Sequence, residues 1–99
     1  MSRTRGWLRL EVKLRAFGGL KKHIGPEITI DLKDNASLET LISALTLRTK
    51  SFRKGYIGPY KAGADLTVLV NGRNMNTLQK PIRLKNGDIV ELVPFSVGG

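Results

Sequence analysis

The residues of this sequence whose type and position suit them for chemistry are the last four, Ser96-Val97-Gly98-Gly99. A carboxylate is a poor electrophile, so acyl transfer from Gly99 requires activation, for instance as an acyl-adenylate made by another enzyme. An active site that surrounds such a carboxylate needs a thin chain leading to it, and glycine lets the backbone pass closely and turn freely because it has no Cβ. From Phe95 to Gly99 an extended chain reaches roughly 16 Å at ~3.3 Å per residue. The sequence therefore predicts a reactive carboxylate on Gly99, at the end of a flexible tail over residues 96–99.

The side chains give little indication of catalysis, metal binding or phosphate binding. The sequence has no cysteine, which removes disulfides, thiolate metal sites and a cysteine nucleophile. His23 is the only histidine, and its place in the basic stretch KKHIG favours a solvated side chain over a catalytic one. No second histidine supports a metal cluster, no glycine-rich stretch matches a phosphate loop, and no close carboxylate pair stands out. We expect no metal site, no bound cofactor and no catalytic activity of the chain's own.

The first element that must support this tail is an alternating strand over residues 7–15, WLRLEVKLR. Its leucines and valine share one side and its charged residues share the other, which is typical of a half-buried strand. A loop over residues 16–26 follows, with Gly18-Gly19 and Gly25-Pro26 as breakers. The stretch EITIDL, residues 27–32, predicts a second alternating strand, so the two strands should form a hairpin.

One helix is predicted from residue 37 to about residue 53. Ser37 can cap the first amides, and Glu39 lies in the first turn, where the helix dipole favours negative charge. Apolar residues follow at helical spacing, and Phe52 continues their stripe; the others are Leu38, Leu41, Ile42 and Leu45.

The rest of the chain adds a glycine-rich connection over 55–65, a third strand over 66–71, short extended pieces over 74–87 and a closing strand over 88–95. Asn71-Gly72 accepts positive φ at both positions, as a tight hairpin turn requires. A crossover through the helix lets strand 7–15 lie parallel to the closing strand. The predicted fold is α+β, a ubiquitin-like β-grasp with a mixed sheet packed on one main helix, forming a single domain over residues 1–99.

The β-grasp order and the terminal sequence NGDIVELVPFSVGG, residues 86–99, resemble the MoaD/ThiS family of sulfur carriers. They also resemble the ubiquitin-related and archaeal small modifier proteins of the same superfamily. The resemblance covers roughly residues 7–99, and because ThiS-like members are typically shorter, it favours the MoaD-like or modifier branch.

This resemblance implies a carrier rather than an enzyme. An activating enzyme would use ATP to adenylate Gly99, and a sulfur donor would convert the terminus to a thiocarboxylate. The sulfur would then serve molybdopterin synthesis, through a molybdopterin synthase large subunit, or tRNA thiolation by its own enzyme. Alternatively, Gly99 would be joined to lysines of target proteins. The sequence leaves sulfur delivery and conjugation open, because both use the same adenylated terminus.

A docking patch beside the tail is the next expectation. If Glu91 faces solvent, Ile89 and Val93 share its face, while Val90 and Leu92 point to the core. The candidate docking residues are apolar ones at or near the closing strand, with Met75 a possible addition: Val93, Phe95, Val97 and Met75. The strand over residues 66–71 is another possible addition, and the sequence leaves its register open. The alternative for Phe95 is a plug at the edge of the core.

The charge is strongly asymmetric and supports a rival hypothesis. The net charge is +9, and residues 1–61 hold 13 Lys/Arg against 5 Asp/Glu, whereas residues 62–99 hold 4 against 3. A basic half attracts nucleic acid or an acidic protein surface, or is simply a solvated face. The rival is an RNA-binding β-grasp module of the TGS kind, with Tyr56 and Tyr60 interleaved among cations that form an anion patch: Arg48, Lys50, Arg53, Lys54 and Lys61.

Two further expectations concern location and role. No apolar run approaches the ~20 residues of a membrane span, and the N-terminal stretch lacks the apolar core of a signal peptide, so we expect a cytoplasmic protein without membrane contact. A purely structural subunit is a third alternative, which predicts no chemistry at the terminus.

Overall fold

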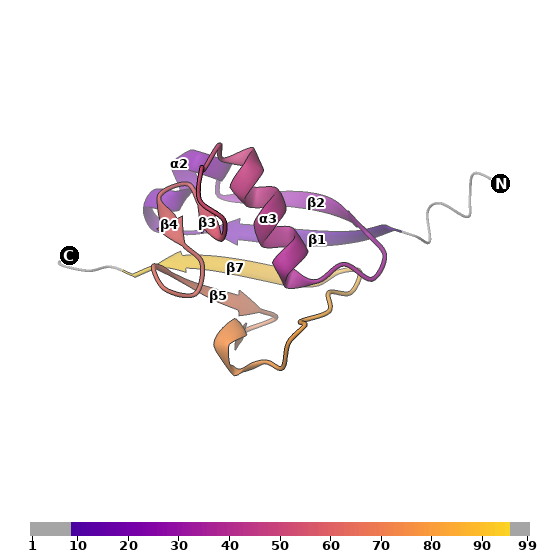
Figure 1. Ribbon diagram of the computed structural model, residues 1–99. Coiled ribbons are helices and arrows are strands. Elements are labelled where there is room, and N and C mark those ends of the chain that lie inside the picture. The colour runs from indigo at the N-terminus through magenta and orange to yellow at the C-terminus, as the bar shows by residue number, and fades with distance from the viewer. Residues whose placement is uncertain (1–8, 96–99) are drawn as a thin grey trace.

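The computed structural model describes residues 9–95 (Figure 1). Residues 7 and 8 of the first predicted strand, and the predicted tail 96–99, lie outside the described residues. The described elements are, in chain order, β1 (Arg9–Ala16), η1 (Gly18–Leu20), α2 (Lys21–Ile24), β2 (Glu27–Lys33), α3 (Leu38–Arg48), β3 (Tyr56–Ile57), β4 (Tyr60–Lys61), β5 (Leu66–Val70), β6 (Arg73–Asn74), η2 (Met75–Thr77) and β7 (Ile89–Pro94).

The main sheet has five strands in the order β2-β1-β7-β5-β6. β1 pairs with β2 as an antiparallel hairpin and with β7 in parallel, while β5 is antiparallel to β7. The parallel pairing follows from the crossover through α3, which lies across one face of the sheet (Figure 1). The predicted hairpin, crossover and parallel closing strand are confirmed.

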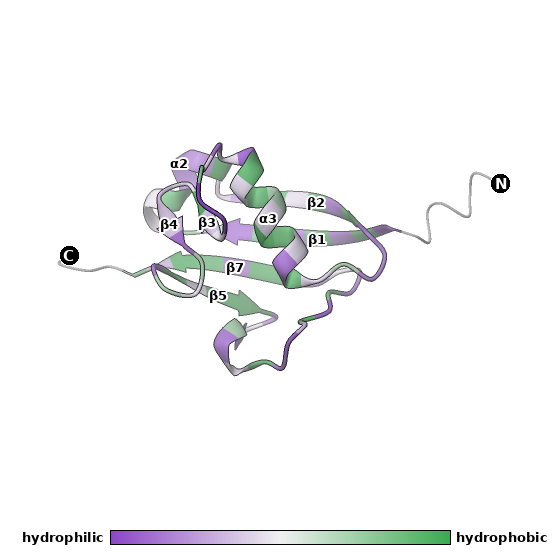
Figure 2. Cartoon of the chain, in the orientation of Figure 1, coloured by the Kyte–Doolittle hydropathy of each residue, from purple (hydrophilic) through white to green (hydrophobic). Residues whose placement is uncertain are grey.

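The core lies between α3 and that face of the sheet. In β1 the alternate residues Leu10, Val12 and Leu14 are buried, and in β7 Val90 and Leu92 are fully buried. Buried apolar residues of α3 complete the core, and Figure 2 shows apolar residues along α3, β5 and β7. Burial of each such side chain contributes about 1.5–3 kcal/mol, so the strands and α3 hold each other in place.

The Asn71-Gly72 turn forms as predicted. Asn71 has φ 50° and Gly72 has φ 85°, and the turn joins β5 to β6 through the Val70–Arg73 pair. The side chain of Asn71 also reaches the start of β7, where its Oδ1 accepts from Ile89 N at 2.9 Å. The turn therefore fixes the beginning of the closing strand.

Two predicted loops contain regular structure. The segment predicted as loop 16–26 holds η1 and α2, because Leu20 and Ile24, one helical turn apart, are both buried. The connection predicted over 55–65 holds the small β3–β4 hairpin, anchored by the fully buried Ile57. Among residues 9–95, no helix has the length and apolar character needed to cross a membrane.

The start of α3 is as predicted, but its end is not. Ser37 Oγ accepts from Thr40 N at 3.2 Å, and Glu39 lies in the first turn. The helix ends at Arg48 rather than at residue 53, because Lys50 takes a left-handed φ of 57°. Its N–H bonds Leu47 O at 3.0 Å and the next N–H, of Ser51, bonds Thr46 O at 3.0 Å, which is the Schellman pattern of a helix end.

Phe52 is consequently not part of the core stripe. The chain has already left the helix at this position, and the Phe52 side chain is fully exposed. Its seven-residue distance from Leu45 matches helical spacing only by coincidence. The expectation that Phe52 packs with the helix stripe is wrong.

Candidate functional site

β7 is the strand that leads to the predicted reactive terminus, and it is held on both sides. Its neighbours are β1 and β5, and its last described backbone contact is a hydrogen bond from Phe95 N to Asp65 O at 3.1 Å. Phe17 N also donates to Leu92 O at 3.1 Å, which ties the entry of η1 to the end of the strand. Gly98 and Gly99 lie outside the described residues, so the strand is described up to the point where the predicted tail begins.

The face of the sheet opposite α3 carries an apolar strip along β7. Val93 pairs with Thr67, and Glu91 pairs with Leu69, across β7 and β5. Val93, Leu69 and Ile89 are half-buried, because no helix covers this side of the sheet in the described part of the chain. We call the strip formed by Leu69, Ile89 and Val93 the open-face strip.

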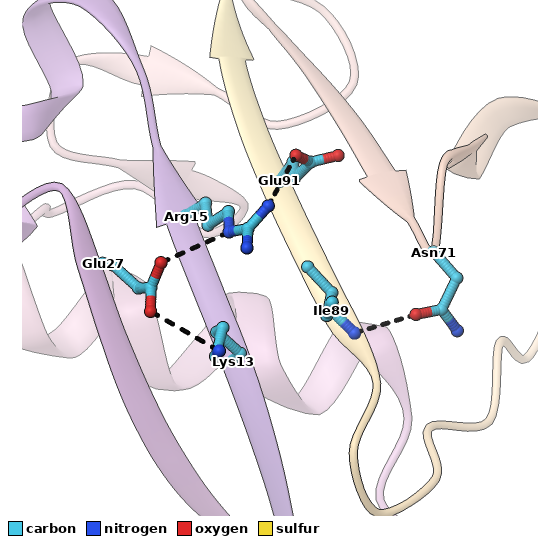
Figure 3. Close-up of polar contacts among 6 residues, drawn as sticks. All are labelled: Lys13, Arg15, Glu27, Asn71, Ile89 and Glu91. Atoms are coloured by element: carbon cyan, nitrogen blue, oxygen red, sulfur yellow. Dashed lines mark hydrogen bonds and ion pairs between the residues drawn. The ribbon is translucent and has the colours of Figure 1, made fainter.

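An ion network lies beside the open-face strip (Figure 3). Arg15 of β1 reaches Glu27 of β2 at 3.3 Å and Glu91 of β7 at 3.8 Å, and Lys13 reaches Glu27 at 3.6 Å. These side chains are substantially exposed, and exposed ion pairs contribute only about 0–1 kcal/mol each. Their main effect is to arrange fixed charges of both signs next to the apolar strip.

The predicted docking residues differ in exposure and do not all belong to the open-face strip. Val93 belongs to the open-face strip, and Phe95, at 54% exposure, is not a plug in the core. Met75 is buried in the core and lies against Gly63, so it adds no exposed surface to the strip. Val97 lies outside the described residues. The docking role of Val93, Phe95 and Val97 stays a prediction.

The sequence placed Ile89 on the same face as Val93 and named strand 66–71 as a possible addition, but it did not single out Leu69. The signal was present in LTVLV, where Leu66, Val68 and Val70 are buried and the intervening residues are not. The prediction had left the register of this strand open. The antiparallel pairing with β7 supplies that register and brings Leu69 opposite Glu91.

The predicted anion patch also divides, because the loop after α3 reverses direction. The side chains of Lys50 and Arg53 line one pocket, together with those of Phe52, Tyr56, Pro59 and His23.

The side chains of Lys54 and Lys61 line a separate small pocket, which also includes Ile42 and Met75. Arg48 is exposed at the end of α3 and lines neither of these two pockets. The five cations therefore do not form one continuous patch.

The first of these sets lines a surface groove of about 470 Å³, which we call the basic groove. Its side chains come from α2 and from the loop that runs from the end of α3 to β4: His23, Lys50, Phe52, Arg53, Tyr56 and Pro59. The guanidinium carbon of Arg53 lies 5.2 Å from the centre of the Tyr56 ring, and Arg53 Nη1 donates to Tyr56 Oη at 3.1 Å.

Hydroxyl groups hold the groove loop in shape. Thr49 Oγ1 donates to Leu45 O at 2.7 Å and accepts from Gly58 N at 2.8 Å, and Ser51 Oγ donates to Gly58 O at 3.0 Å. Gly58 has φ 58°, and a Cβ there would lie 3.3 Å from the His23 ring. His23 is exposed and packs against this loop, and within residues 9–95 no group of three potential metal ligands forms.

The basic groove and the end of β7 lie at the same end of the molecule. Gly18 of η1 lies beside Pro94, close enough that a Cβ on it would be 3.6 Å from the proline ring, and α2 follows η1 directly. Figure 1 shows α2, β3 and β4 at the end of the sheet towards which β7 runs.

Comparisons with known proteins agree with this architecture. A model of the ThiS family matches residues 14–99. No curated protein matches the sequence of this chain. The structure of a putative molybdopterin converting factor, subunit 1, from Pyrococcus furiosus is 28% identical, with a TM-score of 0.69 over 86% of this chain and 97% of that one.

Two further solved structures are similar. A chain in the complex of subunits 1 and 2 of molybdopterin-converting factor from Helicobacter pylori is 26% identical, with a TM-score of 0.54 over 91% of this chain and 100% of that one. SAMP1 from Haloferax volcanii is 18% identical, with a TM-score of 0.69 over 90% of this chain and 99% of that one. The ubiquitin-like β-grasp expected from the sequence is confirmed by these likenesses and by the strand order.

Proposed function

Because this chain belongs to the ThiS family of ubiquitin-like carriers and modifiers, we propose that it carries sulfur on the carboxylate of Gly99. The observation that supports the proposal most directly is the family match, which runs through β7 to residue 99. The protein acts in this proposal as the substrate of a partner enzyme and supplies a shaped surface and a terminus rather than catalytic side chains.

The proposed chemistry has two steps. The Gly99 carboxylate attacks the α-phosphorus of ATP on an activating enzyme, which gives an acyl-adenylate and releases pyrophosphate. A donor of sulfide-level sulfur (HS⁻) then attacks the acyl carbon, the acyl C–O bond to AMP breaks and AMP leaves, and the terminus becomes a thiocarboxylate. ATP belongs to the activating enzyme in this scheme, and the chain itself contributes an end thin enough to enter an active site.

The acceptor that we favour is an enzyme of the molybdopterin-converting kind. The two molybdopterin-converting-factor structures share 28% and 26% identity with this chain, whereas SAMP1 shares 18%, a level at which only the fold is comparable. The Helicobacter pylori structure contains subunit 1 together with subunit 2. We therefore propose a large subunit of that type as the partner, with tRNA thiolation and lysine conjugation as the alternatives that an experiment must separate.

The open-face strip is the proposed docking surface for these partners. It combines half-buried apolar side chains of β5 and β7 with the charges of Arg15 on β1 and Glu91 on β7, and β7 is the strand that leads to the tail. An apolar centre with polar surroundings is the usual composition of a protein–protein interface. A partner bound there would hold β7 while its active site receives Gly99.

Intact-mass analysis of the protein recovered from its native cell tests the proposal. We expect an oxygen-to-sulfur mass change confined to the C-terminal peptide that contains Gly99. Branched Gly-Gly remnants on lysines of other proteins would assign the chain to conjugation instead. If neither modification occurs in cells that contain the activating enzyme, the carrier proposal is wrong.

A further inference from the structure

The basic groove does not take part in the carrier chemistry proposed above, and its composition points to a ligand of a particular kind. From residue 40 to residue 64 the chain contains five Lys and Arg residues and no acidic residue. Among the described residues that line the groove, the ionisable side chains are those of His23, Lys50, Arg53 and Tyr56, and none is a carboxylate. Within residues 9–95, neither Lys50 nor Arg53 forms an ion pair.

The groove presents the aromatic side chains of Phe52 and Tyr56 to solvent, and neither of them is part of the buried core. Phe52 is fully exposed, although helical spacing would have placed it in the core. Tyr56 is half-buried, with the Arg53 guanidinium 5.2 Å from its ring centre. The exposed Phe52 ring offers a flat surface for stacking, and the Arg53 guanidinium on Tyr56 adds a planar cation beside it for bases or phosphates.

From this combination we propose that the basic groove is a binding site for single-stranded RNA. A base stacks on Phe52, beside the Arg53–Tyr56 pair, while Lys50 and Arg53 contact the neighbouring phosphates. A volume of about 470 Å³ is within the range of sites that hold a small ligand or a few groups of a larger one. An acidic polypeptide would satisfy the cations but would leave the exposed Phe52 ring without a stacking partner, so RNA fits the groove better.

The shape of the loop is consistent with a preformed site. Thr49 and Ser51 bond both the N–H and the C=O of Gly58, so the groove floor is fixed by hydrogen bonds before any ligand arrives. Lys50 has its backbone locked at φ 57° by the helix-ending turn, which fixes where its side chain departs. Less conformational freedom then remains to be lost on binding.

Fluorescence anisotropy with a labelled, unstructured RNA of about eight nucleotides tests the proposal, since single-strand sites span roughly 4–16 nucleotides. The wild-type chain should bind the RNA saturably at physiological salt. Phe52→Ala should weaken binding about tenfold, because stacking is the contact it removes. Phe52→Tyr should restore most of the affinity, and circular dichroism should show the same fold for every variant, since the Phe52 side chain is fully exposed.

Two matched controls distinguish binding in the groove from nonspecific apolar contact and from nonspecific attraction by net charge. Leu47→Ala removes an apolar side chain that is 79% exposed, does not line the groove, and should change RNA affinity by less than about twofold. The charge test is Lys50→Asn, because asparagine tolerates positive φ. This variant should reduce the slope of log affinity against log salt by about 0.7, the value for one phosphate contact on a single strand. Arg48→Gln, outside the groove, should leave this slope nearly unchanged.

Three results would overturn the proposal. One is the absence of saturable RNA binding, and another is an equal loss in Leu47→Ala and Phe52→Ala. The third is full competition by polyglutamate at equal charge concentration, which would identify an acidic polypeptide as the ligand. A chain without Gly98 and Gly99 should bind RNA as tightly as the full chain, so this test does not depend on the carrier chemistry.

Discussion

The end of β7 and the loop over residues 49–58 lie at the same end of the molecule but are held in different ways. β7 has a hydrogen-bonded strand on each side, and its alternate residues are fully buried. The loop is held instead by the hydroxyl groups of Thr49 and Ser51, which bond Gly58, and by the one fully buried side chain of Ile57. The strand thus supports the end of the chain from within the main sheet, whereas the loop presents exposed side chains from a hydrogen-bonded surface outside that sheet.

Deleting Gly98 and Gly99 should give the largest effect, a loss of adenylation, and should leave the fold and the loop over residues 49–58 unchanged. Adenylation by the activating enzyme should be abolished, because the reacting carboxylate is then misplaced by two residues. The unfolding temperature should stay within about 2 °C of wild type, since the core side chains of the described part end at Leu92. ATP–pyrophosphate exchange and thermal unfolding measure the two quantities.

A large loss of stability in this deletion would contradict the picture of a tail that leaves the core after Phe95. Retained adenylation would contradict the assignment of Gly99 as the reactive residue.

Val93→Asp should give the next largest effect, and only on partner docking. A carboxylate in the open-face strip must lose its hydration when a partner covers the strip, so the KM for the carrier in adenylation should rise about tenfold or more while kcat changes little. Gln79→Asp adds the same charge at an exposed loop position away from β7 and should leave the KM unchanged. Equal effects of the two substitutions would show that net charge, and not the strip, governs docking.

Thr49→Val should give the smallest effect, and it concerns the loop alone. The half-buried N–H of Gly58 loses its acceptor, so the free energy of unfolding should fall by about 1–2 kcal/mol. Thr29→Val, at an exposed position on β2, should change it by no more than about 0.5 kcal/mol. Urea denaturation followed by circular dichroism provides both values, and identical stability of the two variants would show that the Thr49 hydroxyl does not anchor the loop.

The strands were predictable because their pattern is local. Alternation along WLRLEVKLR and DIVELVPF places Val12, Val90 and Leu92 in the core, and Ser37 and Asn71-Gly72 mark a helix start and a hairpin turn. These signals depend on neighbours within a few residues. The structure confirms them for the described residues, and the parallel pairing of β1 and β7 follows from the order of elements.

The end of α3 and the groove were not predictable for a physical reason. Helices that end in a left-handed residue usually show glycine there, but this one has Lys50, so the common sequence signal is missing. The loop then depends on hydrogen bonds from Thr49 and Ser51 to Gly58, which join residues seven to nine positions apart. Spacing alone could not show that Phe52 is exposed or that Lys50 and Lys61 lie at different pockets.

The parallel pairing of β1 with β7 has a mechanical consequence. Because the two strands run in the same direction, β1 begins at the end of the sheet opposite to the one at which β7 finishes. A pull on the end of β7 against the start of β1 therefore loads the hydrogen bonds between them in shear, all together, rather than opening them one after another. A carrier whose end is gripped by one enzyme after another would in this way resist being unravelled from that end.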